Sequence, residues 1–192
     1  MNQTPHTHLR IKFCVSGAAE TGHCTKDALD KAKELGREIA RRGAVLVNGA
    51  TSGFPYWSAI GAKEENGFTI GLSPAESEHE HVERYNLPLD YMDMIIYTGF
   101  GYAGRNLLLT RSVDAVIVGC GRIGTINEFT DAFEDNKPIG VLTGTGGTTD
   151  MLGEIIKVSN REKDNQKIIF DDNPKILVKR LMELVQKDKV QE

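Results

Sequence analysis

The chain has 192 residues, of which 40% are hydrophobic and 26% charged, and its formal net charge is −4. This composition is typical of a globular protein and argues against a disordered, fibrous or membrane-spanning chain. Lys and Arg are scattered along the sequence, so it lacks the broad positive face that non-specific binding of nucleic acid requires. We therefore expect a soluble protein whose partner is neither nucleic acid nor a membrane.

The first ten residues, 1–10, are polar and contain histidines but no apolar stretch like that of a signal peptide. We expect a flexible N-terminal tail, a cytoplasmic location and a single domain over 1–192. Cys14, Cys24 and Cys120 are odd in number and lack CxxC or CxxxC spacing. This pattern predicts neither a disulfide framework nor a zinc site, and two of the three are expected to be buried as small hydrophobic side chains.

Short β-rich runs alternate with amphipathic helical runs along the whole chain, except for an acidic stretch over 76–89 that is expected to be irregular. Such alternation is typical of parallel strands joined by helical crossovers. The predicted fold class is α/β, a doubly wound, mostly parallel Rossmann-like sheet with helices on both faces. In chain order, the predicted elements are a strand over 11–16, a helix over 25–42, a strand over 44–48, a helix over 56–66, strands over 68–72 and 92–97, a helix over 103–111, a strand over 115–118, a helix over 125–135, a strand over 139–142, a helix over 149–158, a strand over 167–170 and a helix over 174–186.

Four of the predicted strands end in glycine-rich turns: Ser16–Ala18, Gly49–Gly53, Thr98–Gly101 and Gly119–Thr125. Ligands of open α/β sheets bind beyond the carboxyl ends of the strands. Glycine lets the backbone approach a ligand closely, and the free N–H groups of the following helix favour phosphate. One such turn is explained equally well as a tight turn, but four together favour a phosphate site.

The last of these turns has the GxGxxG spacing at Gly119, Gly121 and Gly124. In dinucleotide-binding domains this pattern follows the first strand, whereas here it follows the fifth predicted strand. NAD is therefore disfavoured as a cofactor.

The stretch over 98–142 is the most specific part of the sequence, with Thr-Gly-Phe-Gly-Tyr-Ala-Gly-Arg-Asn over 98–106 and Gly-Arg-Ile-Gly-Thr-Ile-Asn-Glu over 121–128. It resembles the LONELY GUY and lysine decarboxylase-like superfamily of Rossmann-like proteins, which also contains the molybdenum-cofactor carrier proteins. The resemblance spans about 11–145. In that superfamily a proline-glycine-glycine-x-glycine-threonine-x-x-glutamate motif opens a helix, and an arginine one helix upstream completes the site. The matching residues are Arg105, Gly121, Gly124, Thr125 and Glu128.

Several positions depart from the superfamily pattern. Cys120 and Arg122 stand in place of the proline and the second glycine, and Asn106 stands where the hydrolases have a lysine. The Arg-Asn pair resembles the uncharacterised and molybdenum-cofactor carrier branch more than the cytokinin-activating hydrolases. The turn Gly49-Ala50-Thr51 also stands where three glycines are common.

The charged candidates each have two interpretations. Arg105 is either a bidentate clamp for phosphate or a surface arginine at a helix start. Glu128 is either a helix cap or, as the resemblance implies, a carboxylate beside a ribose that supports cleavage of an N-glycosidic bond. Arg122 is either a second phosphate ligand or a plug at that place.

Three other groups receive less weight. His79-Glu80-His81 suggests a metal site, but the two histidines are two positions apart, so no metal is predicted. Phe54, Tyr56 and Trp57 are either core residues or a flat wall against a base or pterin ring. Cys120 at a helix start could have a lowered pKa, but no histidine partner is evident in the sequence, so a nucleophilic role is disfavoured.

Two functions stay open, and whether the protein is an enzyme is left undecided. One is binding or carriage of a phosphorylated heterocycle, with molybdenum cofactor or a nucleoside monophosphate as candidates. The other is a phosphoribohydrolase that cleaves a nucleoside 5′-monophosphate, with Arg105 and Glu128 as catalytic residues. The superfamily also implies a homodimer, which the apolar run 107–109 favours. The predicted ligand-binding residues are Ser16, Gly17, Gly49, Thr51, Arg105, Gly121, Arg122, Ile123, Gly124 and Thr125.

Overall fold

A computed structural model describes residues 9–163 and 166–191, so most of the predicted tail, over 1–8, lies outside the described residues. Within the described part, seven strands form one sheet in the order β4-β3-β2-β1-β5-β6-β7, and every neighbouring pair is parallel. The predicted doubly wound α/β fold is therefore confirmed. The strands are β1 (Lys12–Ser16), β2 (Val45–Asn48), β3 (Thr69–Ser73), β4 (Met94–Tyr97), β5 (Ala115–Val118), β6 (Ile139–Leu142) and β7 (Ile168–Asp171).

The helices alternate with these strands, and each predicted strand and helix is present, β5 and β6 with the expected bounds and the others with one or both ends shifted by a few residues. The stretch over 76–89 is not wholly irregular as predicted, because it contains the short helix α3. The helices are α1 (Ala28–Arg41), α2 (Phe54–Glu64), α3 (Glu78–Glu83), α4 (Gly101–Arg111), α5 (Ile123–Glu134), α6 (Leu152–Val158) and α7 (Pro174–Gln191), and a 3-10 turn, η1 (Thr148–Met151), precedes α6.

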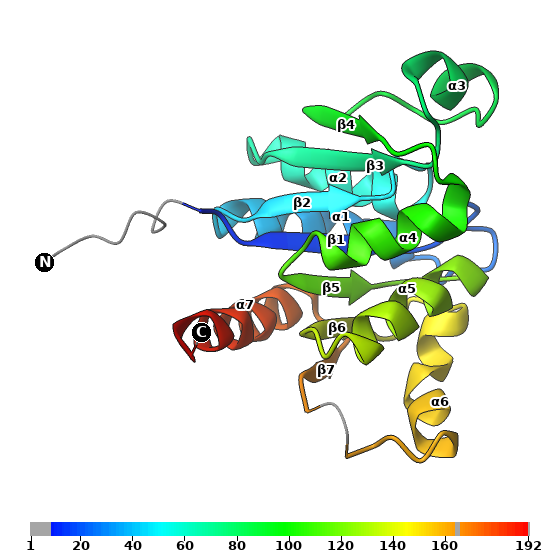
Figure 1. The fold of residues 1–192 in the computed structure, drawn as a ribbon. Coiled ribbons are helices and arrows are strands. Elements are labelled where there is room, and N and C mark those ends of the chain that lie inside the picture. The colour runs from blue at the N-terminus through cyan, green and yellow to red at the C-terminus, as the bar shows by residue number, and fades with distance from the viewer. Residues whose placement is uncertain (1–8, 164–165, 192) are drawn as a thin grey trace, which may run out of the picture.

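Helices cover both faces of the sheet (Figure 1). The side chains of α1, α2 and α7 pack against one face, and those of α4, α5 and α6 pack against the other. Strand β1 serves both layers, because Phe13 and Val15 point to the first and Cys14 to the second. This alternation is the two-residue period of a strand that is buried on both faces.

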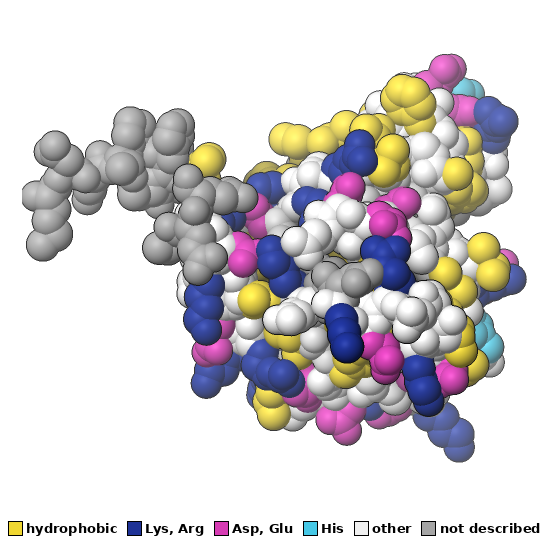
Figure 2. Space-filling view, turned by 60° about the horizontal axis from the view of Figure 1, so that its bottom comes forward, with side chains coloured by type: hydrophobic (Ala, Val, Ile, Leu, Met, Phe, Trp, Pro, Cys, Tyr) yellow, Lys and Arg dark blue, Asp and Glu magenta, His cyan; other side chains and the backbone are white. Residues whose placement is uncertain are grey.

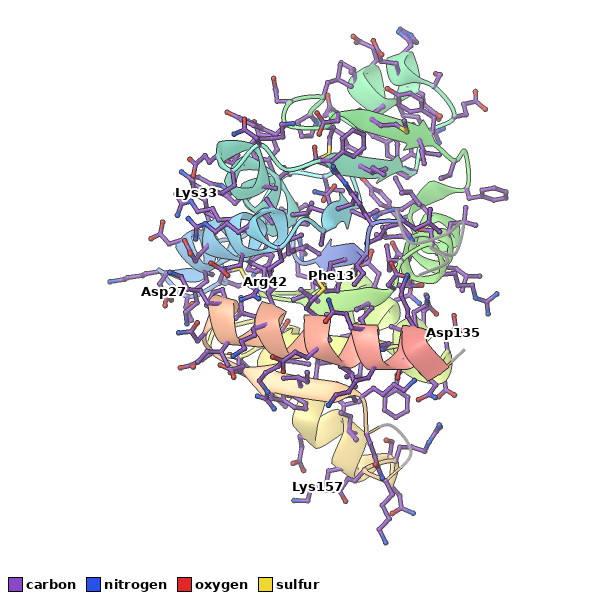
Figure 3. All side chains as sticks on the ribbon, turned by 90° about the vertical axis from the view of Figure 1, so that its left-hand side faces the viewer. Phe13, Asp27, Lys33, Arg42, Asp135 and Lys157 are labelled. Atoms are coloured by element: carbon purple, nitrogen blue, oxygen red, sulfur yellow. A yellow bond between two sulfur atoms is a disulfide. The ribbon has the colours of Figure 1, made fainter. Side chains whose placement is uncertain are left out.

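Helix α7 closes the first layer at the β6–β7 end of the sheet. Leu177 and Leu181 are fully buried and belong to the same core cluster as Phe13. In the view of Figure 3, α7 crosses in front of the sheet, while the labelled side chains of Lys33 and Lys157 lie at the periphery. Leu177 and Leu181, four positions apart, therefore lie on the packing face of this helix.

The chain changes direction at β1, which lies between β2 and β5. The loops that follow β1 and β5 therefore leave the sheet side by side and turn to opposite faces. Such a switch point opens a crevice beyond the carboxyl ends of the two strands. Two of the glycine-rich turns, after Ser16 and after Val118, lie at this place.

His81 has a structural role in the α3 region. Its ring is fully buried. Nε2 lies 3.0 Å from the carbonyl oxygen of Pro88, to which it donates, so Nδ1 accepts from the Ser73 hydroxyl at 2.8 Å. Both nitrogens are thus occupied, and this histidine ties α3 and the loop after it to the end of β3. His81 therefore has no nitrogen left to offer a metal ion.

The prediction that the cysteines form no disulfide is wrong. Cys24 and Cys120 are bonded, with their Cα atoms 5.7 Å apart, although 96 positions separate them in the sequence. Cys14 is a free, buried thiol, and burial raises its pKa. The missing histidine partner of Cys120 is His23, whose Nε2 lies 3.6 Å from its Sγ. Local spacing could not reveal either contact, because the fold brings the loop after β1 to the exit of β5.

The surface carries both signs of charge. Figure 2 shows Lys and Arg interspersed with Asp and Glu on the visible face, with no broad field of one sign. On α1, for example, Arg37 and Arg41 are both paired with Glu34. Within residues 9–163 and 166–191, none of the helices has the length and the apolar character that crossing a membrane demands.

Helices α1 and α2 approach each other through glycine. A Cβ at Gly36 would overlap the backbone oxygen of Ser58, and a Cβ at Gly61 would overlap the backbone oxygen of Lys33. Both atoms belong to backbone, which cannot rotate away. The two glycines therefore set the close approach of these helices, which bury the first layer of the core.

We expect Gly61→Ala to destabilise the fold by about 1–3 kcal/mol, the range for overpacking, although alanine is the better helix former. The matched control is Gly124→Ala in α5, where an added Cβ meets nothing within 4 Å. This control should leave the free energy of unfolding within about 0.5 kcal/mol of that of the unchanged protein. Urea titration followed by circular dichroism measures both, and equal effects of the two substitutions would contradict the close helix contact.

Candidate functional site

A cavity of about 420 Å³ opens at the switch point of the sheet. Its walls are the exits of β1 and β2, the inward face of α4 and the first two turns of α5. Its size lies within the range of small-molecule sites. Of the predicted site residues, those that line it are Ser16, Gly17, Gly49, Thr51, Arg105, Arg122, Ile123, Gly124, Thr125 and Glu128.

Arg105 is a buried cation in this wall rather than a surface arginine. It lies in the second turn of α4 and is only 5% exposed. Its guanidinium crosses the exit of β2, where a Cβ at Gly49 would collide with Nη1. Among the described residues its Nε has no hydrogen-bond partner. A buried N–H of a charged group without an acceptor is costly, so this atom is a strong candidate for contact with a ligand oxygen.

Glu128 is held by groups from two other elements. The Ser16 hydroxyl donates to Oε2, and Arg105 Nη1 lies 3.5 Å from Oε1. The side-chain amide of Asn106 lies beside this carboxylate; its nitrogen donates to Oδ1 of Asn127 at 2.9 Å, and with the amide turned by 180° it would instead donate to Oε1 of Glu128 at 3.0 Å. Burial raises the pKa of Glu128, while Arg105 and Ser16 act to lower it. The carboxylate is therefore part of an internal network between β1, α4 and α5, rather than a cap of its own helix.

The start of α5 presents positive charge to the cavity. Its N-cap residue, Arg122, makes no capping bond with its side chain, and no acidic residue occupies the first turn of this described helix. The N–H groups of Ile123 and Gly124 are thus available at the positive end of the helix dipole. A Cβ at Gly124 would meet nothing within 4 Å, so the space beside this backbone is open. The geometry suits an anion.

Arg122 lies at the rim of the cavity. It pairs with Glu20, and both side chains are exposed, by 57% and 81%. An exposed arginine of this kind does not fill the cavity. Of the two interpretations that the sequence left open for Arg122, the structure therefore does not show the plug. Its charge remains free to turn toward an anion, because a surface ion pair is weak.

Several of the predicted glycines make room for side chains rather than for a ligand. A Cβ at Gly17 or at Gly119 would overlap the ring of Phe54, which is fully buried between the two strand exits. Gly121, which does not line the cavity, is packed against the side chain of Thr125. The turn at Gly99 and Gly101 also lies outside the cavity lining. Both of these glycines have positive φ, 69° and 63°, so the turn requires them.

The aromatic wall is formed by a residue that sequence reasoning missed. Phe54 belongs to the core, and the ring of Tyr56 packs edge-on against Tyr91 at 5.3 Å. Tyr102 instead lines the cavity together with Pro55, and its ring packs against Tyr85 at 5.4 Å. The signal was present in the sequence, since Tyr102 lies three residues before Arg105 and hence on the same side of α4.

Comparison with known proteins finds close matches in fold. The molybdenum cofactor binding protein from Rippkaea orientalis is 27% identical, with a TM-score of 0.74, and the match covers 93% of this chain and 99% of that one. The molybdenum cofactor carrier protein from Chlamydomonas reinhardtii is 24% identical, with a TM-score of 0.69 and coverage of 91% and 99%.

An uncharacterised protein from Archaeoglobus fulgidus is 32% identical over 132 residues, which are 69% of this chain and 82% of the relative. Residues 10–178 match the SLOG cluster4 family. These matches confirm the resemblance to the LONELY GUY-like superfamily and to its molybdenum-cofactor carrier branch that the sequence predicted. The chain belongs to the SLOG cluster4 family.

Proposed function

We propose that this protein binds a phosphorylated small molecule with a flat heterocyclic ring, either molybdenum cofactor or a nucleoside monophosphate, in the cavity at the switch point of the sheet. The unsatisfied Nε of buried Arg105 is the observation that carries this proposal. A phosphate oxygen there would complete the hydrogen bonding of the guanidinium. The ligand is then held in the cytoplasm, in keeping with the location that the sequence predicts.

The start of α5 would provide the second half of the phosphate site. Its open N–H groups at Ile123 and Gly124 line the same cavity as Arg105. Backbone donors at a helix start and a buried guanidinium together suit a dianion better than either does alone. Thr51, which follows β2 and lines the cavity, would offer a hydroxyl group beside them.

The ring of the ligand would lie toward Tyr102. This side chain lines the cavity and is half exposed, so it has a free face against which a base or a pterin could stack. The similarity to the Rippkaea orientalis protein, whose description names molybdenum cofactor as its ligand, supports the pterin. Native mass spectrometry of the protein as purified from cells would identify the retained mass.

We expect Arg105→Lys to weaken the binding of adenosine or guanosine 5′-monophosphate by about 2 kcal/mol, roughly 30-fold, because lysine has no planar fork to replace the guanidinium. Lysine keeps the charge beside Glu128 and so protects the fold. The control is Arg122→Ala at the rim, for which we expect a loss below about 1 kcal/mol. Isothermal titration calorimetry measures both. A larger loss at Arg122 than at Arg105 would move the phosphate out of the buried site.

A second candidate function is hydrolysis of a nucleoside 5′-monophosphate to a free base. The observation that favours it is Glu128, a carboxylate that lines the cavity beside Arg105. If ionised, it could stabilise the positive charge that develops on the ribose as the N-glycosidic bond breaks. Ser16 and Arg105 act to lower the pKa of Glu128 and so favour the ionised form, against the effect of burial.

Glu128→Gln separates the two functions. If the protein is a hydrolase, this substitution should keep nucleotide binding but slow base release by at least ~100-fold, because the negative charge is lost. If it is a carrier, the unchanged protein should release no base, and the substitution should change only affinity. Release of adenine or guanine, followed by chromatography, is the measurement. Turnover that survives Glu128→Gln would remove Glu128 from the catalytic role.

We also propose that the protein is a homodimer built on β4 and α4. Strand β4 is the last strand at one edge of the sheet, and Met94 and Ile96 on it are about half exposed. Leu107 and Leu108 on α4 are exposed by 39% and 40%. Apolar side chains exposed on an edge strand and on the helix that follows it in the chain suit a self-complementary contact.

We expect Leu108→Lys to convert a dimer into a monomer at micromolar concentration, since a charge at the centre of an apolar contact has no partner. Val158→Lys on α6, at a site that is 73% exposed and away from this patch, should leave the dimer unchanged. Sedimentation velocity distinguishes the species. A monomeric unchanged protein would overturn the proposal.

A further inference from the structure

Outside the cavity, three metal-ligating side chains meet between the loop after β1 and the exit of β5. A ring nitrogen of His23 and the two sulfur atoms of Cys24 and Cys120 all lie within 4.8 Å of one another. His23 is exposed, Cys24 is partly buried and Cys120 is fully buried. None of the three lines the larger cavity, although Arg122 and Ile123 line both that cavity and the hollow beside this cluster.

Backbone hydrogen bonds hold the two cysteine segments together independently of the disulfide. The segment 145–148, which leads into η1, forms a bond with each of them: Thr25 N donates to the carbonyl of Thr145, and Thr148 N donates to the carbonyl of Gly121, each at 3.0 Å. Ala18 N also donates to the carbonyl of Cys120 at 2.7 Å. Reduction of the disulfide would therefore leave both thiols close to each other and to His23.

Two thiolates and an imidazole are the ligands that thiophilic cations prefer. A Cys₂His set leaves one position of a tetrahedral ion open, or completes a three-coordinate Cu(I) site. A hollow of about 340 Å³, lined by His23, Gly121, Gly147 and Met151 among others, lies beside the cluster and gives access to it. The thioether of Met151 adds a soft donor on this side.

We propose that the reduced protein binds one thiophilic cation, Zn(II) or Cu(I), through His23, Cys24 and Cys120, and that this cation and the disulfide exclude each other. A two-electron reductant such as a phosphine first converts the disulfide into two thiols and takes an oxygen atom from water. The cation then displaces the two thiol protons. His23 Nε2, which lies 3.2 Å from the carbonyl oxygen of Gly121, turns to the cation, and this carbonyl keeps its bond from Thr148 N.

The test uses the full chain, reduced with a phosphine without oxygen and then freed of the reductant. Zn(II) or Cu(I) is titrated in competition with a colorimetric chelator. We expect one equivalent bound by the reduced protein at this site and none by the oxidised protein. Cys24→Ser and Cys120→Ser should bind at least ~100-fold more weakly, since each removes a thiolate ligand. The control, Cys14→Ala, should retain the full equivalent, because Cys14 is a buried thiol outside the cluster.

His23→Ala keeps both cysteines, and His23 is an exposed residue, so a failure to fold is not expected. We expect it to bind at least ~10-fold more weakly. Equal affinity of this variant and the unchanged protein would overturn the three-ligand site, as would equal affinity of the reduced protein and Cys24→Ser. Met151→Leu distinguishes the cations. If this variant loses affinity for Cu(I) alone, the site is assigned to Cu(I). If it still binds Zn(II) tightly and prefers Zn(II) to Cu(I), the site is assigned to Zn(II).

Discussion

The contact between Arg105 and Glu128 joins the parts of the molecule on which the candidate site depends. One residue comes from α4 and the other from α5, and Ser16 at the end of β1 binds the same carboxylate. Both charges are almost completely buried. Removing one partner of such a pair leaves the other uncompensated, at a cost of about 3–5 kcal/mol. The pair therefore fixes how the two helices flank the switch point, and the cavity is the space left between them.

The position of Arg105 also accounts for one of the glycines at the strand exits. Gly49 must lack a side chain because the guanidinium of Arg105 occupies that place. Gly124 lacks one for a different reason, since the space beside it is open to the cavity. A glycine in a strand exit can thus serve packing or a ligand, and the motif alone does not distinguish the two. The atoms that surround each Cβ position in the structure distinguish the two roles.

The regular part of the fold could be predicted from the sequence because its signals are local: alternating strands and helices need only hydrophobic periodicity, and the bounds of β5 and β6 agree with those expected. Most of the cavity lining was also predictable, because parallel strands bring their carboxyl ends to one edge. The disulfide and the hydrogen bond from Ser16 to Glu128 were not, because each is a contact between elements whose distance only the fold decides. His23 is a further case, since it meets two sulfur atoms from segments 96 positions apart. A set of ligands that comes from separate loops has no sequence spacing by which it can be recognised. The motif around His81 does have a local spacing, but both ring nitrogens of His81 are already hydrogen-bonded.

The charge balance of the cavity has a consequence for any anion that binds there. Arg105 is already neutralised in part by Glu128, whose pKa burial raises. A phosphate near Arg105 would place a further negative charge close to this carboxylate and raise its pKa again. Uptake of a proton by Glu128 would then relieve the repulsion and leave the full charge of Arg105 to the phosphate. For a carrier this protonation strengthens retention, whereas for a hydrolase it removes the charge that the reaction needs. The protonation state of one buried carboxylate thus marks the chemical difference between holding a nucleotide and cleaving it.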